Sequence, residues 1–446
     1  MRIESCAACS GLILTFVVAL RENDGPKQCI ILNKDSPLLF GRRSLCLLFL
    51  AALAVRGAFV AFASPRGDDL VFPDSASYDS IARNWLAGKG FRETSGRQAS
   101  RAPGYPVFLA ACHSLGLQRP QGIYLVQAAA DSAMCVLLAL LGRRLFGDTA
   151  GFLAGCIAAI CPFFIFYTGF LLAETLFTLG LVALMLFLFE CRDALEKSTS
   201  RMLLLSAAAG VLLGLLVLLR SSLLLFPLFL LPIWLAWARN RRRAMTAWGT
   251  MIAAMALVML PWIVRNYEIF GRFIPTTLQV GESLYEANSP YADGGPAMDR
   301  IDWVKERGGG PMGEYENNQF FRNAALKYIR EHPGRFCALA VEKFMRFWNP
   351  LPNYGPYRRP MGIAVNLCAF VPIILLACAG ILRRKRDAAT LLLLLSPVAY
   401  FTLLHTVFVG SVRYRTPIMP FVILLAALGM ESVWARRRRS APARET

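Results

Sequence analysis

Long apolar runs alternate with short polar turns along most of the chain. A helix needs about 20 mostly apolar residues to cross a bilayer, and several of the runs approach that length. The pattern therefore predicts an all-α, polytopic membrane protein with about ten transmembrane helices. The predicted spans are 44–63, 122–142, 150–168, 172–190, 203–219, 222–238, 246–264, 362–382, 388–408 and 417–435.

The composition indicates the same class of protein. Of the 446 residues, 56% are hydrophobic and 17% are charged, and the mean hydropathy is +0.47. A soluble domain has about a quarter of its residues charged. A soluble core could not absorb this much apolar surface, whereas lipid can, so the composition excludes an ordinary soluble globular protein.

The basic residues lie where they fix an orientation in the membrane. Lysine and arginine number 48, and aspartate and glutamate number 29, which gives a formal charge of +19. The basic clusters at 239–243, 383–386 and 436–439 each follow an apolar run directly, as cytoplasmic anchors beside transmembrane helices do. This placement favours anionic lipid headgroups over nucleic acid as the partner. We expect both termini to be cytoplasmic.

With that orientation, two long polar segments fall on the outer face of the membrane. Neither is of low complexity, so both are expected to fold. The predicted organisation is a cytoplasmic leader (1–42), a membrane domain (43–264) that contains the first outer catalytic loop (64–121), an outer-face helical insertion (265–361), the C-terminal transmembrane helices (362–435) and a basic cytoplasmic tail (436–446).

Both outer segments carry helix signals. Residues 75–87 predict a short amphipathic helix, with Asp74 as its N-cap and Gly88 as its stop. Residues 314–348 predict two more helices, broken at Pro333 because proline removes a backbone donor and clashes with the preceding turn.

Membrane-adjacent charge outside the cytoplasmic clusters converges on the outer face. Charge at membrane depth is costly and usually marks function. Several arginines with few acids suit an anionic ligand, because guanidinium binds phosphate oxygens in a bidentate manner. An isolated carboxylate among them suits a general base. The residues concerned are Asp74, Tyr78, Arg101, Glu174, Arg220, Arg265, Asn266, Arg413, Tyr414 and Arg415.

Several short motifs resemble those of GT-C-fold glycosyltransferases, most of all the protein O-mannosyltransferase-like group that includes bacterial lipid A aminoarabinose transferases. The resemblance covers roughly 44–435, and its motifs occur in a consistent order. They are Pro73-Asp74-x-x-x-Tyr78-x-x-x-Ala82, Gly88-x-Gly90-Phe91, Arg101-x-Pro103-Gly104-Tyr105-Pro106, Ala173-Glu174-Thr175-Leu176-Phe177, Pro261-Trp262-x-x-Arg265-Asn266-Tyr267, Gly281-x-x-Leu284-Tyr285-x-x-Asn288 and Arg413-Tyr414-Arg415-x-Pro417.

The resemblance implies a GT-C architecture with outer-face loop helices, and it implies transfer of a sugar. A sugar would pass from a polyprenyl-phosphate donor to a hydroxyl of a glycan, lipid or protein acceptor, by a single displacement with inversion, at the periplasmic face of a bacterial inner membrane. The family's base, an acid in the first outer loop, maps onto Asp74. Implied contacts to the donor phosphate or substrate are Arg101, Glu174, Arg220, Arg265, Asn288, Arg413, Tyr414 and Arg415, and implied contacts to the sugar are Tyr78, Tyr105 and Tyr285.

One departure from the family concerns metal ions. Many members have two adjacent acids at the position of the base, whereas Asp74 is followed by Ser75. We therefore predict no bound metal and no other cofactor.

Each of these residues also has a structural interpretation. Asp74 could only cap its helix, and Glu174 could only complement a helix dipole. The arginines could be interfacial anchors or could stabilise loops, and the tyrosines could pack against the membrane domain. Arg56, inside the first span, requires a buried partner that the sequence does not identify, and for Asp131 and His405 structural hydrogen bonding is the default.

Two other functions fit a chain of this class. A polymerase or ligase of surface polysaccharide also has many spans and a large outer loop, and would place its key residues in the later loop. A lipid or sugar transporter would show broken helices and paired charges at the bilayer midplane.

Overall fold

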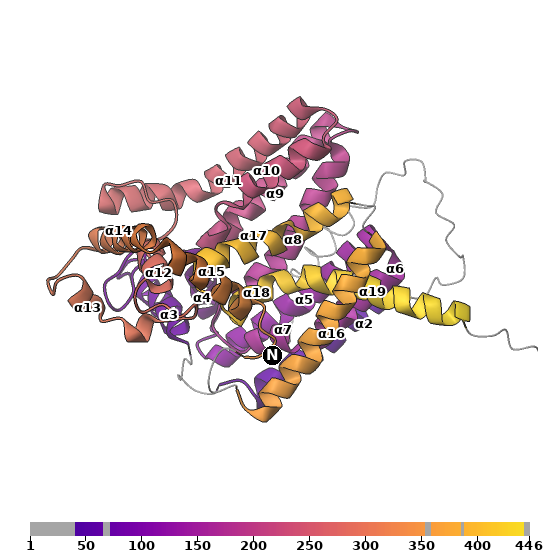
Figure 1. Cartoon of the computed structure of the whole chain (residues 1–446), viewed down its shortest axis with the longest axis horizontal. Coiled ribbons are helices and arrows are strands. Elements are labelled where there is room, and N and C mark those ends of the chain that lie inside the picture. Colours follow the sequence, from indigo (N-terminus) through magenta and orange to yellow (C-terminus); the bar gives the residue numbers. More distant parts are fainter. Residues whose placement is uncertain (1–40, 66–71, 353–357, 385–387, 441–446) are drawn as a thin grey trace, which may run out of the picture. The chain divides into compact units, whose positions relative to one another are not determined.

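All of the regular structure is helical in the part of the chain that the computed structural model describes, residues 41–65, 72–352, 358–384 and 388–440 (Figure 1). These ranges belong to one compact unit, Leu39–Thr446. The predicted leader 1–42 lies outside the described residues, except for its last two positions. The all-helical prediction is confirmed.

Among the described residues, eight helical segments are long and apolar enough to cross a membrane. Each coincides with a predicted span. They are α2 (Arg42–Phe62), α5 (Pro120–Phe146), α8 (Glu174–Ala194), α9 (Thr199–Leu219), α11 (Arg241–Phe270), α16 (Pro360–Arg384), α17 (Ala388–Val407) and the run of α18 (Val412–Arg415), η4 (Thr416–Ile418) and α19 (Met419–Ser440).

The other two predicted spans fall on shorter apolar helices, α6 (Asp148–Ile160) and α10 (Phe226–Trp237). A proline explains the break after α6. Cys161 is extended because Pro162 follows it, and the chain continues as the separate helix α7 (Pro162–Tyr167). Before α10, Arg220 adopts an extended conformation that ends α9, and the turn η1 (Ser221–Leu223) follows.

The membrane helices pack closely where small residues face a neighbour. α9 lies along α11, α16 along α19, and α5 along α6 (Figure 1). At the first of these interfaces a Cβ atom on Gly210 would lie 2.2 Å from the carbonyl oxygen of Met251. Because lipid supplies no hydrophobic force between helices, such close backbone contacts are a main source of helix association in a membrane.

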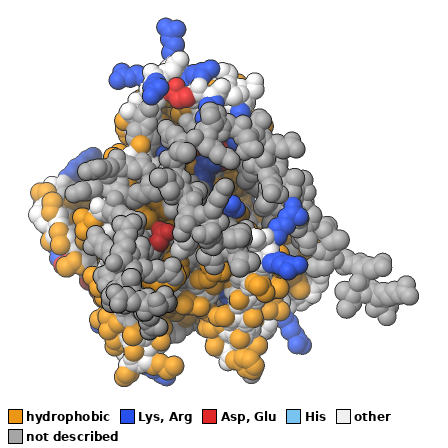
Figure 2. All heavy atoms as spheres, turned by 90° about the vertical axis from the view of Figure 1, so that its right-hand side faces the viewer, with side chains coloured by type: hydrophobic (Ala, Val, Ile, Leu, Met, Phe, Trp, Pro, Cys, Tyr) orange, Lys and Arg blue, Asp and Glu red, His pale blue; other side chains and the backbone are white. Residues whose placement is uncertain are grey.

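The helices differ in how much of their surface the protein covers. The apolar window within Val412–Trp434 is 78% buried, whereas those of α2 and α16 are 22% buried. The C-terminal helix is therefore central, and α2 and α16 leave apolar side chains for lipid. Figure 2 shows hydrophobic side chains over much of the lower part of one face and Lys and Arg side chains near its top.

The buried Arg56 of α2 finds its partner in Asp131 of α5. Its Nε lies 2.5 Å from a carboxylate oxygen of Asp131, and both side chains are buried. The remaining guanidinium donors reach the carbonyl oxygens of Ala52, Ala158 and Ala159. The pair is thus fully enclosed by helices and serves to join α2 to α5.

In the described part of the two long loops, six helices lie at one end of the membrane bundle, which we call the loop face. In the first loop these are α3 (Pro73–Leu86) and α4 (Gly104–Ser114), and in the second they are α12 (Val280–Ala287), α13 (Trp303–Glu306), α14 (Glu314–Glu331) and α15 (Pro333–Phe347). The predicted break at Pro333 is confirmed. Gly88, at φ +70°, follows the end of α3 as predicted.

The predicted N-cap role of Asp74 is wrong. α3 begins at Pro73, which suits the first helical position because its missing N–H would have no partner there. The N-cap is Phe72, and Asp74 lies inside the first turn. Its carboxylate pairs instead with two arginines.

Candidate active site

The Asp74 carboxylate lies between two guanidinium groups. One oxygen is 2.8 Å from Nη2 of Arg101, and the other is 2.7 Å from Nη1 of Arg413. The Asp74 side chain is 24% exposed. The base predicted from the sequence is therefore ionised, firmly held and still open to a substrate.

A second carboxylate extends this group of ion pairs. Glu174 is fully buried, and its Oε1 accepts a hydrogen bond from Nε of Arg413 at 2.5 Å. The same oxygen lies 2.9 Å from Nη1 of Arg220, an ion pair without the alignment of a hydrogen bond. Arg413 thus bridges the two acids. We call Asp74, Arg101, Glu174, Arg220 and Arg413 the ion-pair cluster.

Distant parts of the sequence meet in this cluster because each contributes a helix end. Glu174 is the first residue of α8, and Arg220 is the residue at which α9 stops. Arg413 lies in the first turn of α18, whose N-cap Ser411 accepts a hydrogen bond from the Arg413 amide. Helix ends at one level of the bundle therefore place opposite charges side by side, and the arginines neutralise the acids.

The cluster sets the protonation state of Asp74. Burial by itself would raise the pKa of Asp74, but the charges of Arg413 and then Arg101 outweigh it and lower the pKa to about 2. For Tyr78, burial and the nearby Asp74 raise the pKa to about 12, so it stays a neutral phenol. Glu93 also lies 3.8 Å from Nε of Arg101, so the three guanidinium groups face three carboxylates and the charges balance.

Aromatic rings line the cluster. Arg101 lies over the ring of Tyr78, and Arg220 and Arg413 each lie about 6 Å from the ring centre of Tyr414, in the range of cation–π contacts. Tyr105 packs edge-on against Tyr78 and donates a hydrogen bond to Gln127 at 2.6 Å. Tyr78 and Tyr414 therefore border the site, whereas Tyr105 is buried beneath them.

Four other predicted residues lie outside the cluster. Arg265 donates to the carbonyl oxygens of Phe91 and Gln98, and Arg415 to those of Phe347 and Asn349.

The other two residues belong to the second loop, which their hydrogen bonds hold in place. Asn288 donates to the carbonyl oxygens of Leu284 and Val407 and accepts a hydrogen bond from Lys343. Tyr285 donates to the carboxylate of Glu306. A role for Arg265, Arg415 and Asn288 in binding the donor phosphate or substrate stays a prediction, as does contact of Tyr285 with the sugar. Either role would require these bonds to open.

Glu286 of α12 is a site residue that the sequence did not reveal. It is buried, and its carboxylate accepts a hydrogen bond from the amide of Ala297 at 2.9 Å. Burial raises its pKa, and the charge of nearby Asp74 raises it further. Glu286 stands at a variable position of the motif between Leu284 and Asn288. The only signal in the sequence was that it is an acid.

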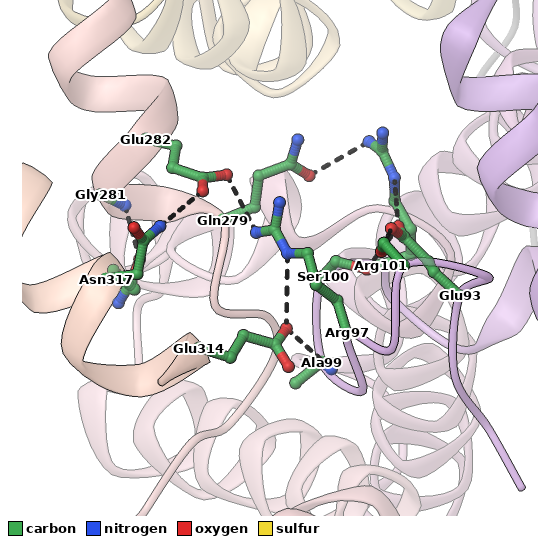
Figure 3. Close-up of polar contacts among 12 residues, drawn as sticks. Glu93, Arg97, Ala99, Ser100, Arg101, Gln279, Gly281, Glu282, Glu314 and Asn317 are labelled. Carbon is green, nitrogen blue, oxygen red and sulfur yellow. Dashed lines mark hydrogen bonds and ion pairs between the residues drawn. The ribbon is translucent and has the colours of Figure 1, made fainter. Parts of the chain in front are cut away.

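A polar interface joins the second loop to the first beside the cluster (Figure 3). Arg97 pairs with Glu282 at 2.9 Å, and Glu314 accepts hydrogen bonds from the amides of Gln98 and Ala99. Arg101 belongs to both structures, because its Nη1 donates to Gln279 while its Nη2 pairs with Asp74. Docking of the second loop therefore orients an arginine of the cluster.

The interface yields a prediction for Glu314. Replacing it with alanine removes the acceptor of two part-buried amides, at a cost of about 1–3 kcal/mol to that local structure. We expect faster hydrogen exchange at residues 97–101 and little change in the membrane helices, measured by mass spectrometry. The control is Glu331→Ala, at the other end of the same helix, where the Glu331 side chain is 53% exposed. Unchanged exchange at 97–101 would show that other contacts hold the interface.

The cluster does not fit a resident divalent cation. Among the described residues, no group of three or more His, Cys, Asp or Glu side chains lies close enough to hold a metal ion. Both oxygens of Asp74 are already paired with guanidinium groups. Positive charge at this site therefore comes from arginine.

Comparison with known proteins agrees with this architecture. Residues 100–264 match the family model for dolichyl-phosphate-mannose-protein mannosyltransferase. A search of curated proteins finds no match. The structure resembles that of the oligosaccharyltransferase AglB from the archaeon Archaeoglobus fulgidus, in complex with an inhibitory peptide and a dolichol-phosphate, with a TM-score of 0.55 and 15% identity. The alignment covers 89% of this chain and 52% of AglB. The chain has the GT-C fold.

Two further structures give similar alignments. The apo form of the Archaeoglobus fulgidus oligosaccharyltransferase matches with a TM-score of 0.56 and 15% identity, covering 91% of this chain and 53% of that chain. ArnT from Cupriavidus metallidurans, bound to undecaprenyl phosphate, matches with a TM-score of 0.46 and 15% identity, covering 90% and 80%. The chain spans about half the length of the oligosaccharyltransferase chains. The GT-C resemblance expected from the sequence motifs is confirmed.

Proposed function

We propose that this chain is a membrane glycosyltransferase that moves a sugar from a polyprenyl-phosphate donor to an acceptor hydroxyl. The observation that carries the proposal is the part-exposed Asp74 carboxylate, paired with Arg101 and Arg413 at the loop face of a GT-C fold. A carboxylate beside several arginines matches a reaction in which a hydroxyl loses a proton while a phosphate departs.

The reaction would be a single displacement with inversion. The acceptor oxygen attacks the anomeric carbon and forms the new glycosidic bond. The bond between that carbon and the phosphate oxygen breaks, and its electron pair stays on the polyprenyl phosphate. Asp74 takes the proton of the acceptor hydroxyl. Arg101, Arg220 and Arg413 stabilise the charge that gathers on the departing phosphate.

The membrane position of the site suits a lipid-linked donor. Glu174 and Arg220 lie at the ends of apolar helices, and Asp74 of the loop helix α3 pairs with Arg413 beside them. An isoprenoid tail can therefore lie in the bilayer while its phosphate reaches the arginines. The matching family is described by its use of dolichyl-phosphate mannose, and the similar AglB structure contains a dolichol-phosphate. We place the loop face on the outer side of a bacterial inner membrane, because the basic residues at 239–243 then lie on the cytoplasmic side.

The test is a transfer assay with purified protein, radiolabelled sugar donors and native membrane extract as the acceptor. We expect transfer from at least one polyprenyl-phosphate hexose or aminosugar and none from the corresponding nucleotide sugar. Transfer from nucleotide sugars alone would refute the lipid-linked donor. Lack of transfer from every donor, with protein shown to be folded, would favour the transporter or the polysaccharide polymerase or ligase.

A further inference from the structure

Most guanidinium nitrogens of Arg101 and Arg413 already face protein groups, whereas Nη1 of Arg220 has no hydrogen-bond partner among the described residues. All three nitrogens of Arg101 face protein groups: Nε faces Ser77, Nη1 faces Gln279 and Nη2 faces Asp74. Arg413 directs Nη1 to Asp74 and Nε to Glu174. A phosphate that bound these guanidinium groups by two hydrogen bonds each would therefore have to replace an existing acceptor.

The acceptors that a phosphate can replace most readily are the two carboxylates. A phosphate oxygen and a carboxylate oxygen make the same kind of charge-assisted bond to guanidinium. Glu174 binds two arginines through Oε1, while its buried Oε2 has no hydrogen-bond partner among the described residues. Asp74, in contrast, is part-exposed and lies in the first turn of a loop helix. Asp74 is thus the acceptor that can move away.

We propose that the donor phosphate competes with Asp74 for Arg101 and Arg413, so that binding of the lipid phosphate is the event that releases the base. This inference rests on the proposed transferase function.

The exchange gives the site an order of events. While both arginines hold Asp74, its low pKa makes it a poor acceptor for the proton of a hydroxyl. When a guanidinium group turns from Asp74 to the phosphate, the Asp74 carboxylate becomes more basic. The other titratable groups that face Asp74 are Tyr78, Tyr414 and Glu286. An acceptor hydroxyl would then lose its proton only after the donor is in place.

The test measures binding rather than transfer. Purified protein in detergent is titrated with radiolabelled undecaprenyl phosphate, which carries no sugar and cannot react. Because Asp74→Asn removes the competing charge and keeps the size of the side chain, we expect about fivefold tighter binding than in the wild type. Asp74→Ala also removes the competing carboxylate, should likewise bind more tightly, and serves if Asp74→Asn does not fold. The control is Asp79→Asn on the same helix, since Asp79 pairs with Arg83 and His113 outside the cluster.

The outcomes separate this inference from the function on which it rests. Weaker or unchanged binding in both variants, with wild-type binding intact, overturns the exchange and leaves the transferase standing. Failure of the wild-type protein to bind the lipid phosphate at all overturns both. Inorganic phosphate as competitor should give the same ranking of affinities among the variants. A ranking that appears only with the lipid would assign the effect to the isoprenoid tail and contradict the exchange.

Discussion

Asp74→Asn should reduce the rate of sugar transfer by a factor of about 10²–10⁴, the usual contribution of a general base. Asparagine keeps the size of the side chain and remains next to Arg101 and Arg413, but it cannot take the proton of the acceptor hydroxyl. The loss should appear in kcat. The KM for the lipid donor should not rise, because the guanidinium groups that bind its phosphate are still present. The measurement is initial rate against donor concentration at fixed acceptor.

The matched control for this experiment is Asp79→Asn, which changes an acid of the same helix and should keep a rate close to that of the wild type. Thermal unfolding of both variants checks that the cluster has not collapsed. If Asp74→Asn keeps full activity, the base is another carboxylate, with Glu174 as the first candidate because Arg413 also holds it.

The pH dependence of Asp74 has a definite sign. Its pKa in the folded protein, about 2, lies below that of an unfolded aspartate, about 3.9. The ion pairs therefore stabilise the fold fully above the unfolded pKa and lose this contribution as the pH falls through the folded pKa. Between pH 5 and 8 this contribution does not change, so any change in the stability of the protein without bound donor comes from other groups.

Much of the fold could be predicted from the sequence because hydrophobic length is a strong signal in a membrane protein. The two predicted spans that became short helices show its limit. Residues 150–168 and 222–238 are almost entirely apolar, but Pro162 breaks the first run and the 3-10 turn Ser221–Leu223 takes up the start of the second. Hydropathy measures the preference of side chains for lipid, and it does not show where the chain leaves the helix.

The candidate site was partly accessible by the same reasoning. Asp74, Arg101, Glu174, Arg220 and Arg413 were each expected at one face, and the structure brings the five into contact. The pairing of particular residues could not be predicted, because it depends on how segments up to 339 positions apart in the sequence are arranged. Arg265 illustrates this limit. Like the cluster arginines it is an arginine expected at the outer face, yet it donates its hydrogen bonds to backbone carbonyl oxygens.

Breaking the buried pair of Arg56 and Asp131 should have the largest effect on stability. Asp131→Asn would leave the guanidinium charge enclosed without a counter-charge, at a cost of about 3–5 kcal/mol. We expect a clear loss of folded protein in detergent, measured as a fall in the midpoint of thermal unfolding. Asp148→Asn is the control, because Asp148 pairs with Arg143 at the surface, where both side chains are about half exposed.

The double variant Arg56→Met with Asp131→Leu separates the two possible reasons for this cost. If the pair serves only to neutralise charge, two apolar side chains of similar volume should restore most of the stability, since replacing a buried ion pair is often neutral. The bonds from Arg56 to the carbonyl oxygens of Ala158 and Ala159 argue for a further role, because they hold the end of α6 next to α2. α6 leads through α7 to Glu174, so this contact positions one acid of the ion-pair cluster. A double variant that is stable but transfers sugar more slowly would therefore show that the pair positions the site. Full stability with full activity would instead show that the two side chains only neutralise each other's charge.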